Sequence, residues 1–151
     1  MILTKISVSP DSIMRVVLAT VLVGCESGKM PTYPVHGKVT FSDGKPLSTG
    51  WVSFRSIGDA KGISAGGQIQ PDGTFRLATF ERNDGAVEGR HQALVMIPVR
   101  GERDDFKDPL PPPPIDGRFS NFDSSGLEFT VSTDPAKNQF VIQVTPPPAP
   151  R

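Results

Sequence analysis

Thiol or imidazole chemistry could come from only three side chains of this sequence, Cys25, His36 and His91. The two histidines do not stand in the HxH, HxxxH or HExxH spacings that bring metal ligands or a catalytic base together on one element. We therefore expect a structural role for both, with no catalytic residue, no metal site and no cofactor. A single cysteine excludes an intramolecular disulfide, so a role for Cys25 has to come from its surroundings.

Cys25 follows a short apolar segment. Arg15 precedes the uncharged run at 16–23, which is too short to span a bilayer, and the small residue Gly24 stands directly before the cysteine. The sequence Leu-Val-Gly-Cys at 22–25 resembles the lipobox of bacterial lipoproteins. The resemblance implies that residues 1–24 are a signal peptide cleaved between Gly24 and Cys25, and that Cys25 carries a diacylglycerol. Several acyl chains hold such an anchor stably where a single chain would be marginal.

The residues around this segment refine the prediction. Residues 1–13 fit a signal peptide poorly because Pro10 and Asp11 are unusual near its start, so we expect the true start at Met14. Residues 25–32 are small and polar and predict a flexible tether. Glu26, rather than an aspartate, follows the cysteine, which favours the outer membrane over retention at the inner one. We expect a cell-envelope protein whose first partner is the membrane.

Charge and composition limit the other partners. Sixteen Lys and Arg balance 16 Asp and Glu, so the basic excess that binds phosphates is missing and no nucleic-acid partner is expected. Fifteen glycines and 16 prolines favour turns over long helices. Envelope proteins and glycans remain as candidate partners.

The elements that must position these residues are short strands. Apolar and polar residues alternate with a period of two, between turns rich in Gly, Asp and Pro. The most apolar segment predicts a central strand covered on both faces. The pattern predicts an all-β sandwich over residues 33–145 and a proline-rich tail at 146–151. Seven strands are expected, at residues 33–41, 51–55, 63–69, 74–80, 90–99, 127–131 and 139–144.

Strand phase also places the two histidines. His36 alternates with the apolar residues of its strand and is expected to face solvent. His91 shares the phase of Ala93 and Val95 and is expected at the edge of the core. The two imidazoles are thus not expected to meet.

Residues 100–118 break the strand pattern and predict an exposed loop, because prolines and closely spaced charges do not suit a buried strand. Four acidic residues between positions 102 and 108 raise the question of a calcium site. Arg103 and Lys107 are interleaved with them and the EF-hand spacing is absent, so a solvated loop of mixed charge is the preferred interpretation. The acidic residues are Glu102, Asp104, Asp105 and Asp108.

The order of short motifs along the chain resembles the carboxypeptidase regulatory-like domain, and in particular the small transthyretin-like lipoproteins of planctomycete bacteria. The resemblance implies a seven-stranded Greek-key sandwich of the transthyretin or prealbumin type that is generally noncatalytic. His91 takes the place of a tyrosine that often makes a hydrogen-bonding corner in such domains. The motifs are Val35–Thr40, Asp43–Leu47, Trp51–Phe54, Pro71–Phe75, Gly89–Val95, Gly117–Ser120 and Ser125–Leu127.

Three functions stay open at this point. The expected one is a noncatalytic binding or structural module of the envelope, which could lend a strand edge to a partner protein. The alternative is a carbohydrate-binding module with Trp51 or Tyr33 as the stacking platform, although aromatic residues on short strands are more often core. Phe119 and Phe122, which lie near a loop, are further candidates for such a stacking platform, and they too are more often core residues. A transthyretin-like hydrolase is a remote third, because the Tyr-Arg-Gly-Ser motif of the hydroxyisourate hydrolases does not occur in this sequence.

Overall fold

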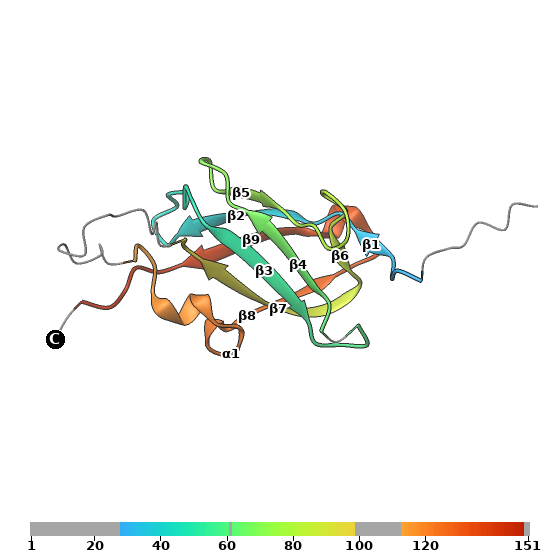
Figure 1. The fold of residues 1–151 in the computed structure, drawn as a ribbon. Helices are drawn as coiled ribbons and strands as arrows, with labels where there is room; N and C mark the ends of the chain where they lie inside the picture. Colours follow the sequence, from blue (N-terminus) through green and yellow to red (C-terminus); the bar gives the residue numbers. More distant parts are fainter. Residues whose placement is uncertain (1–27, 61, 99–112, 150–151) are drawn as a thin grey trace, which may run out of the picture.

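The computed structural model describes residues 28–60, 62–98 and 113–149, and this part is built almost entirely from strands (Figure 1). The helices η2 (Gly117–Ser120), α1 (Phe122–Ser125) and η3 (Pro135–Lys137) are single turns. None of the helices in these ranges is long and apolar enough to cross a bilayer. The all-β prediction is confirmed. The strands are β1 (Thr32–Tyr33), β2 (His36–Phe41), β3 (Trp51–Ser56), β4 (Ser64–Gln68), β5 (Thr74–Arg76), β6 (Ala86–Val87), β7 (Gly89–Met96), β8 (Leu127–Val131) and β9 (Gln139–Val144).

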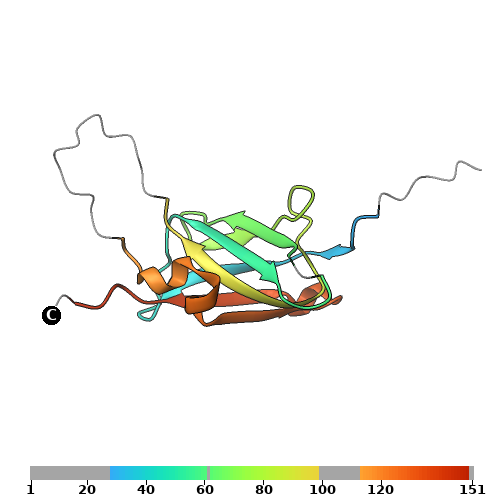
Figure 2. The same cartoon turned by 60° about the horizontal axis from the view of Figure 1, so that its bottom comes forward.

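Two sheets form the body of the protein. The larger sheet is antiparallel, with the order β4-β3-β7-β8. The second sheet has the order β5-β2-β9, and its β2–β9 pair is parallel. Strands β1 and β6 form a separate small ribbon. In Figure 2 the two larger sheets lie one above the other, so each has an inner face and an outer face.

The inner faces meet in a core centred on Phe54. Its ring lies 5.2 Å from the Phe129 ring and 6.0 Å from the Phe140 ring, centroid to centroid, and Phe75 packs from the second sheet at 6.4 Å. Val52 and Phe54 are fully buried, as the alternation of β3 predicts. Burying each such side chain contributes about 1.5–3 kcal/mol, so this apolar layer is the main source of stability.

Several predicted boundaries differ from the observed ones for backbone reasons. The strand expected at 33–41 is divided, because Pro34 between β1 and β2 has no N–H to donate. The strand expected at 74–80 is shorter, with β5 ending at Arg76, although the Leu77 N–H still donates to the Val35 carbonyl at 3.0 Å in line with the β2–β5 register. The next residue, Ala78, pairs with Gly66 of β4 in an isolated antiparallel bridge, so the chain passes there from the β5–β2 ladder to the other sheet.

Two burial predictions also need correction. Met96, expected to be covered on the outer face of the central strand, is 43% exposed. Ile115, placed by the sequence in an exposed loop, is buried in the core, and the Asp116 N–H donates to the Thr145 carbonyl just after β9. The loop expected at 100–118 is therefore fixed to the sandwich from Ile115 onward. The four acidic residues between positions 102 and 108, like the signal peptide and Cys25, lie outside the described residues.

The connection between β8 and β9 depends on one buried amide. Asn138 is fully buried, its Nδ2 donates to the Ser132 carbonyl at 2.8 Å, and its Oδ1 accepts from the Ser132 N–H at 2.8 Å. The side chain thus satisfies the backbone of Ser132 as a neighbouring strand would. The Asn138 carbonyl in turn accepts from the His36 N–H at 3.1 Å, which sets the start of the β2–β9 pairing.

We predict that Asn138→Ala lowers the free energy of unfolding by about 2–4 kcal/mol, because both Ser132 backbone groups lose their partner in a buried position. Asn138→Asp should be at least as destabilising, since it keeps the acceptor but places a buried, unpaired carboxylate oxygen against the Ser132 carbonyl. Urea denaturation followed by circular dichroism measures the change. Gln143→Ala, on the exposed face of β9, is the control and should change the stability little. A loss of stability in Asn138→Ala as small as that of the control would contradict this role.

Candidate functional site

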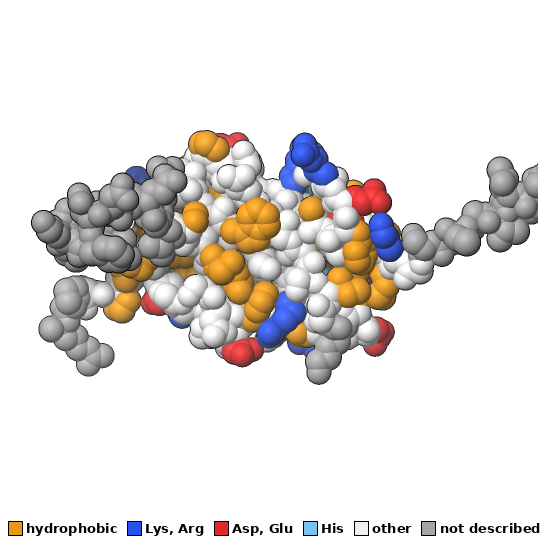
Figure 3. All heavy atoms as spheres, viewed as in Figure 1, with side chains coloured by type: hydrophobic (Ala, Val, Ile, Leu, Met, Phe, Trp, Pro, Cys, Tyr) orange, Lys and Arg blue, Asp and Glu red, His pale blue; other side chains and the backbone are white. Residues whose placement is uncertain are grey.

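The outer face of the four-stranded sheet carries an exposed tryptophan. Trp51 is 43% exposed, whereas its neighbour Val52 is fully buried, because the two side chains leave opposite faces of β3. Figure 3 shows hydrophobic side chains gathered in the middle of the surface that covers β3, β4 and β7. The general expectation that aromatic residues on short strands belong to the core is wrong for Trp51.

A glycine supports the indole ring from below. A Cβ at Gly66 on the adjacent strand β4 would lie 2.8–3.0 Å from three atoms of the indole, Nε1, Cζ2 and Cε2. Three nearly equal distances place the face of the ring, rather than its edge, over Gly66. One face of the indole therefore lies on the sheet, while 43% of the residue stays open to solvent.

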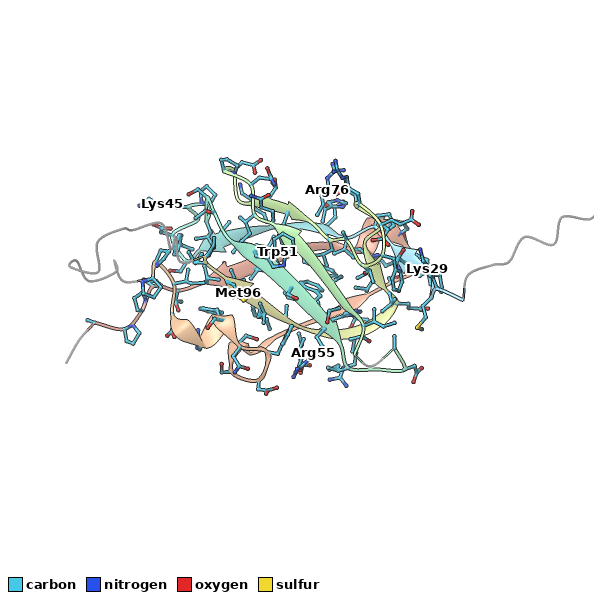
Figure 4. All side chains as sticks on the ribbon, viewed as in Figure 1. Lys29, Lys45, Trp51, Arg55, Arg76 and Met96 are labelled. Carbon is cyan, nitrogen blue, oxygen red and sulfur yellow. The ribbon has the colours of Figure 1, made fainter. Side chains whose placement is uncertain are left out.

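The neighbours of Trp51 on this face are polar on one side and apolar on the other. In register, Trp51 stands opposite Gln68 on β4 and Met96 on β7. Ser53 follows on the same face of β3, opposite Leu94. Figure 4 shows Trp51 and Met96 side by side on the outer surface, so amide and hydroxyl groups border an apolar patch of two large side chains.

Arg55 closes the far end of this face. Its Nη2 donates to Gln92 Oε1 at 2.8 Å and to Asp123 Oδ1 at 3.2 Å, and its guanidinium lies 4.4 Å from the centre of the Phe122 ring. These contacts fix the guanidinium. Trp51 and Arg55 are four residues apart on one strand, a separation of roughly 13 Å. We call the surface between them, formed by Trp51, Ser53, Arg55, Gly66, Gln68, Gln92 and Met96, the Trp51 face.

The other aromatic candidates lie elsewhere or are covered. Tyr33 is half-buried in β1 and packs against the core. Phe119 is 2% exposed. Phe122 is half-buried beneath Arg55 and belongs to the border of the Trp51 face. Sequence reasoning identified Trp51 but missed Met96 and Gly66, because their place beside it depends on the register of three strands. Arg55 was also missed, although it shares the strand and the phase of Trp51 and the alternation of β3 alone could have found it.

The structure does not bring the two histidines together. His36 is exposed on β2, as its phase predicts, whereas His91 is 1% exposed on β7 and packs against Phe54 at a centroid distance of 6.1 Å. Ser56 stands opposite His91, and its buried Oγ has no hydrogen-bond partner among the described residues. Within the described ranges, no three His, Cys, Asp or Glu side chains are grouped in a way that could hold a metal ion.

Burial sets the protonation of His91. Loss of hydration lowers the pKa of its imidazole, and the hydrogen bond from Nδ1 to the Gly89 carbonyl at 3.0 Å offsets this only in part. The folded protein therefore holds the neutral ring, with the proton on Nδ1.

No family model, curated protein or solved structure matches this chain. The resemblance to carboxypeptidase regulatory-like domains thus stays a prediction, and the function has to be argued from the site.

We predict that stability falls as the pH drops below about 6.5, the pKa of an unperturbed histidine, toward the lower pKa of folded His91. In that interval the unfolded chain binds a proton that the folded chain does not, so acid favours unfolding. Urea midpoints measured between pH 7.5 and 5.5 should lose most of this dependence in His91→Phe. His36→Gln, which changes an exposed imidazole, should keep it; the reverse pattern would contradict the assignment.

Proposed function

We propose that this chain is a noncatalytic lipoprotein of the bacterial cell envelope whose β-sandwich binds neutral saccharides on the Trp51 face. The observation that carries the proposal is the indole of Trp51, which rests flat over Gly66 with 43% of the residue exposed. A pyranose ring presents a face of C–H groups that packs on an indole, and its hydroxyl groups need donors and acceptors beside the ring. Gln68 and Ser53 stand at those positions.

The charge of the Trp51 face supports a neutral ligand. Arg55 is paired with Asp123, so the charged groups at this end balance each other. The distance of roughly 13 Å between Trp51 and Arg55 suits a short oligosaccharide better than a single sugar. Because the face is open, binding by one module should be weak and depend on the indole contact.

The proposal includes the fold and the anchor. We assign the sandwich to the seven-stranded Greek-key, transthyretin-like class, preceded by a signal peptide at 1–24 and anchored through lipidated Cys25. In its favour, seven strands of three or more residues occur in the described part, and each lies within or close to a predicted range. The lipobox-like sequence at 22–25 supports the anchor.

A second candidate function follows from the strand edges. Among the described strands, β8 pairs only with β7 and β9 only with β2, so both sheets have an open edge on these strands. Val141 on β9 is 65% exposed. A partner protein of the envelope could add a strand there, in which case binding would depend on β9 and be indifferent to Trp51.

We expect the wild-type protein, expressed in a bacterial host, to gain acyl mass and to enter the detergent phase. Cys25→Ser should stay unmodified and aqueous, because it lacks the sulfur that forms the thioether. Intact-mass spectrometry and detergent partitioning measure both properties. An unmodified, aqueous wild type would contradict the anchor.

We expect Trp51→Ala to weaken saccharide binding by at least about tenfold, because truncating an aromatic anchor at the centre of a binding surface costs on the order of 2 kcal/mol. Isothermal titration with cellohexaose, chitohexaose and laminarihexaose measures the affinity. Phe80→Ala is the matched control, since Phe80 is 41% exposed and lies outside the Trp51 face. Binding of no hexasaccharide, or equal binding by Trp51→Ala, would contradict the proposal.

Gly66→Ala tests the geometry without removing the indole. The added methyl group would lift the ring from the sheet, while the backbone of Gly66 does not have a positive φ and accepts alanine. Affinity should fall with little loss of stability. The chain has one tryptophan, so a shift in its emission spectrum reports the movement directly.

A further inference from the structure

The end of the sandwich where the chain enters carries exposed apolar side chains. Met30 is 40% exposed and Phe80 is 41% exposed. Lys29 Nζ lies 3.6 Å from Glu81 Oε1, so the residues next to Met30 and Phe80 in sequence contact each other. Met30 and Pro31 also line an open hollow of about 450 Å³ together with loop 57–60 and residues 88–90. We call this end, formed by residues 29–33, 57–60 and 79–90, the anchor end.

The entering segment is fixed to the anchor end by specific contacts. Thr32 and Tyr33 pair with Val87 and Ala86 in the β1–β6 ribbon. A Cβ at Gly85 would overlap the Tyr33 carbonyl, so glycine with a φ of +91° is needed for this approach. The chain is therefore held from Thr32 onward and cannot swing freely about the body of the sandwich.

Asp84 organises the loop that carries Phe80. Its carboxylate accepts backbone N–H groups from Thr79 at 2.6 Å, Phe80 at 2.9 Å and Glu81 at 3.0 Å. Partial burial raises the pKa of Asp84, but the three N–H donors outweigh it and the net pKa lies below the ordinary value. The loop is thus held in place with Phe80 pointing outward.

The length of the tether brings the anchor end close to any membrane that holds Cys25. Met30 is five positions after Cys25, so the two Cα atoms are at most roughly 18 Å apart. Cys25 would sit at the headgroup boundary once its acyl chains are inserted. The opposite end, marked by Lys45 in Figure 4, lies at the far side of the molecule from Lys29.

We propose that the anchor end rests on the phospholipid surface, with Met30 and Phe80 in the headgroup region; this rests on the proposed lipid anchor. The charged residues of this end carry no basic excess that would attract anionic lipid, with Lys29, Arg82 and Arg90 against Asp59, Glu81, Asp84 and Glu88. The contact therefore depends on apolar side chains and the short tether rather than on anionic lipid, and added salt should leave it intact. The Trp51 face, which lies between the anchor end and the opposite end marked by Lys45, would then face along the membrane rather than toward it.

Site-specific quenching tests this docking on the full lipidated chain. Alkylation of Cys25 in the anchored protein leaves an introduced cysteine as the one free thiol. Met30→Cys, Phe80→Cys and the control Lys45→Cys are each labelled with a small fluorophore and reconstituted in phosphatidylcholine vesicles. Vesicles with nitroxide groups near the top of the acyl chains should quench labels 30 and 80 several-fold more than label 45, at low and high salt.

The outcomes separate the docking from the anchor. Vesicle flotation of all three variants with equally weak quenching would overturn the docking and leave the lipid anchor standing. Failure of the proteins to float would refute the anchor and, with it, the docking that depends on it. An unchanged Trp51 emission spectrum in each variant verifies that the sandwich is folded.

Discussion

The antiparallel pairing of β3 with β7 is the constraint on which the rest of this structure depends. In this register Phe54 stands opposite Ala93 and Val52 opposite Val95, and all four side chains are fully buried between the sheets. A slip of one residue would exchange the two faces and expose the core. The same register places Trp51 and Met96 on the outer face, so the position of the proposed binding surface follows from the packing of the core.

Much of the fold follows from alternation in the sequence, because a period of two assigns the faces of β3, β7 and β9 without knowledge of their partners. The alternation cannot reveal register between strands far apart in sequence. The place of Met96 beside Trp51 and of Gly66 beneath it depends on such pairings, and residue-type statistics pointed the other way for Trp51. Ile115 was missed for a similar reason, since an isolated apolar residue after four prolines shows no period.

The proposed anchor and the proposed binding surface reinforce each other. A flat face with one aromatic platform binds a single chain of sugars weakly, because little ligand surface becomes buried. Many copies held on one membrane would act together on a polymeric glycan, and binding by the first raises the effective concentration for the next. A sandwich held by β1 and the Asp84 loop would keep all copies in one orientation, which limits the entropy lost when they bind a common polymer.

The most direct test of the central claim is the nuclear magnetic resonance spectrum of the soluble Cys25→Ser protein during titration with the hexasaccharide that binds. The one tryptophan gives a single indole N–H signal, and Met96 gives a methyl signal beside it. We predict that these two signals, together with the Gln68 and Gln92 amides, shift with a common affinity. Shifts confined to β8 and β9, with the Trp51 indole unmoved, would contradict the account.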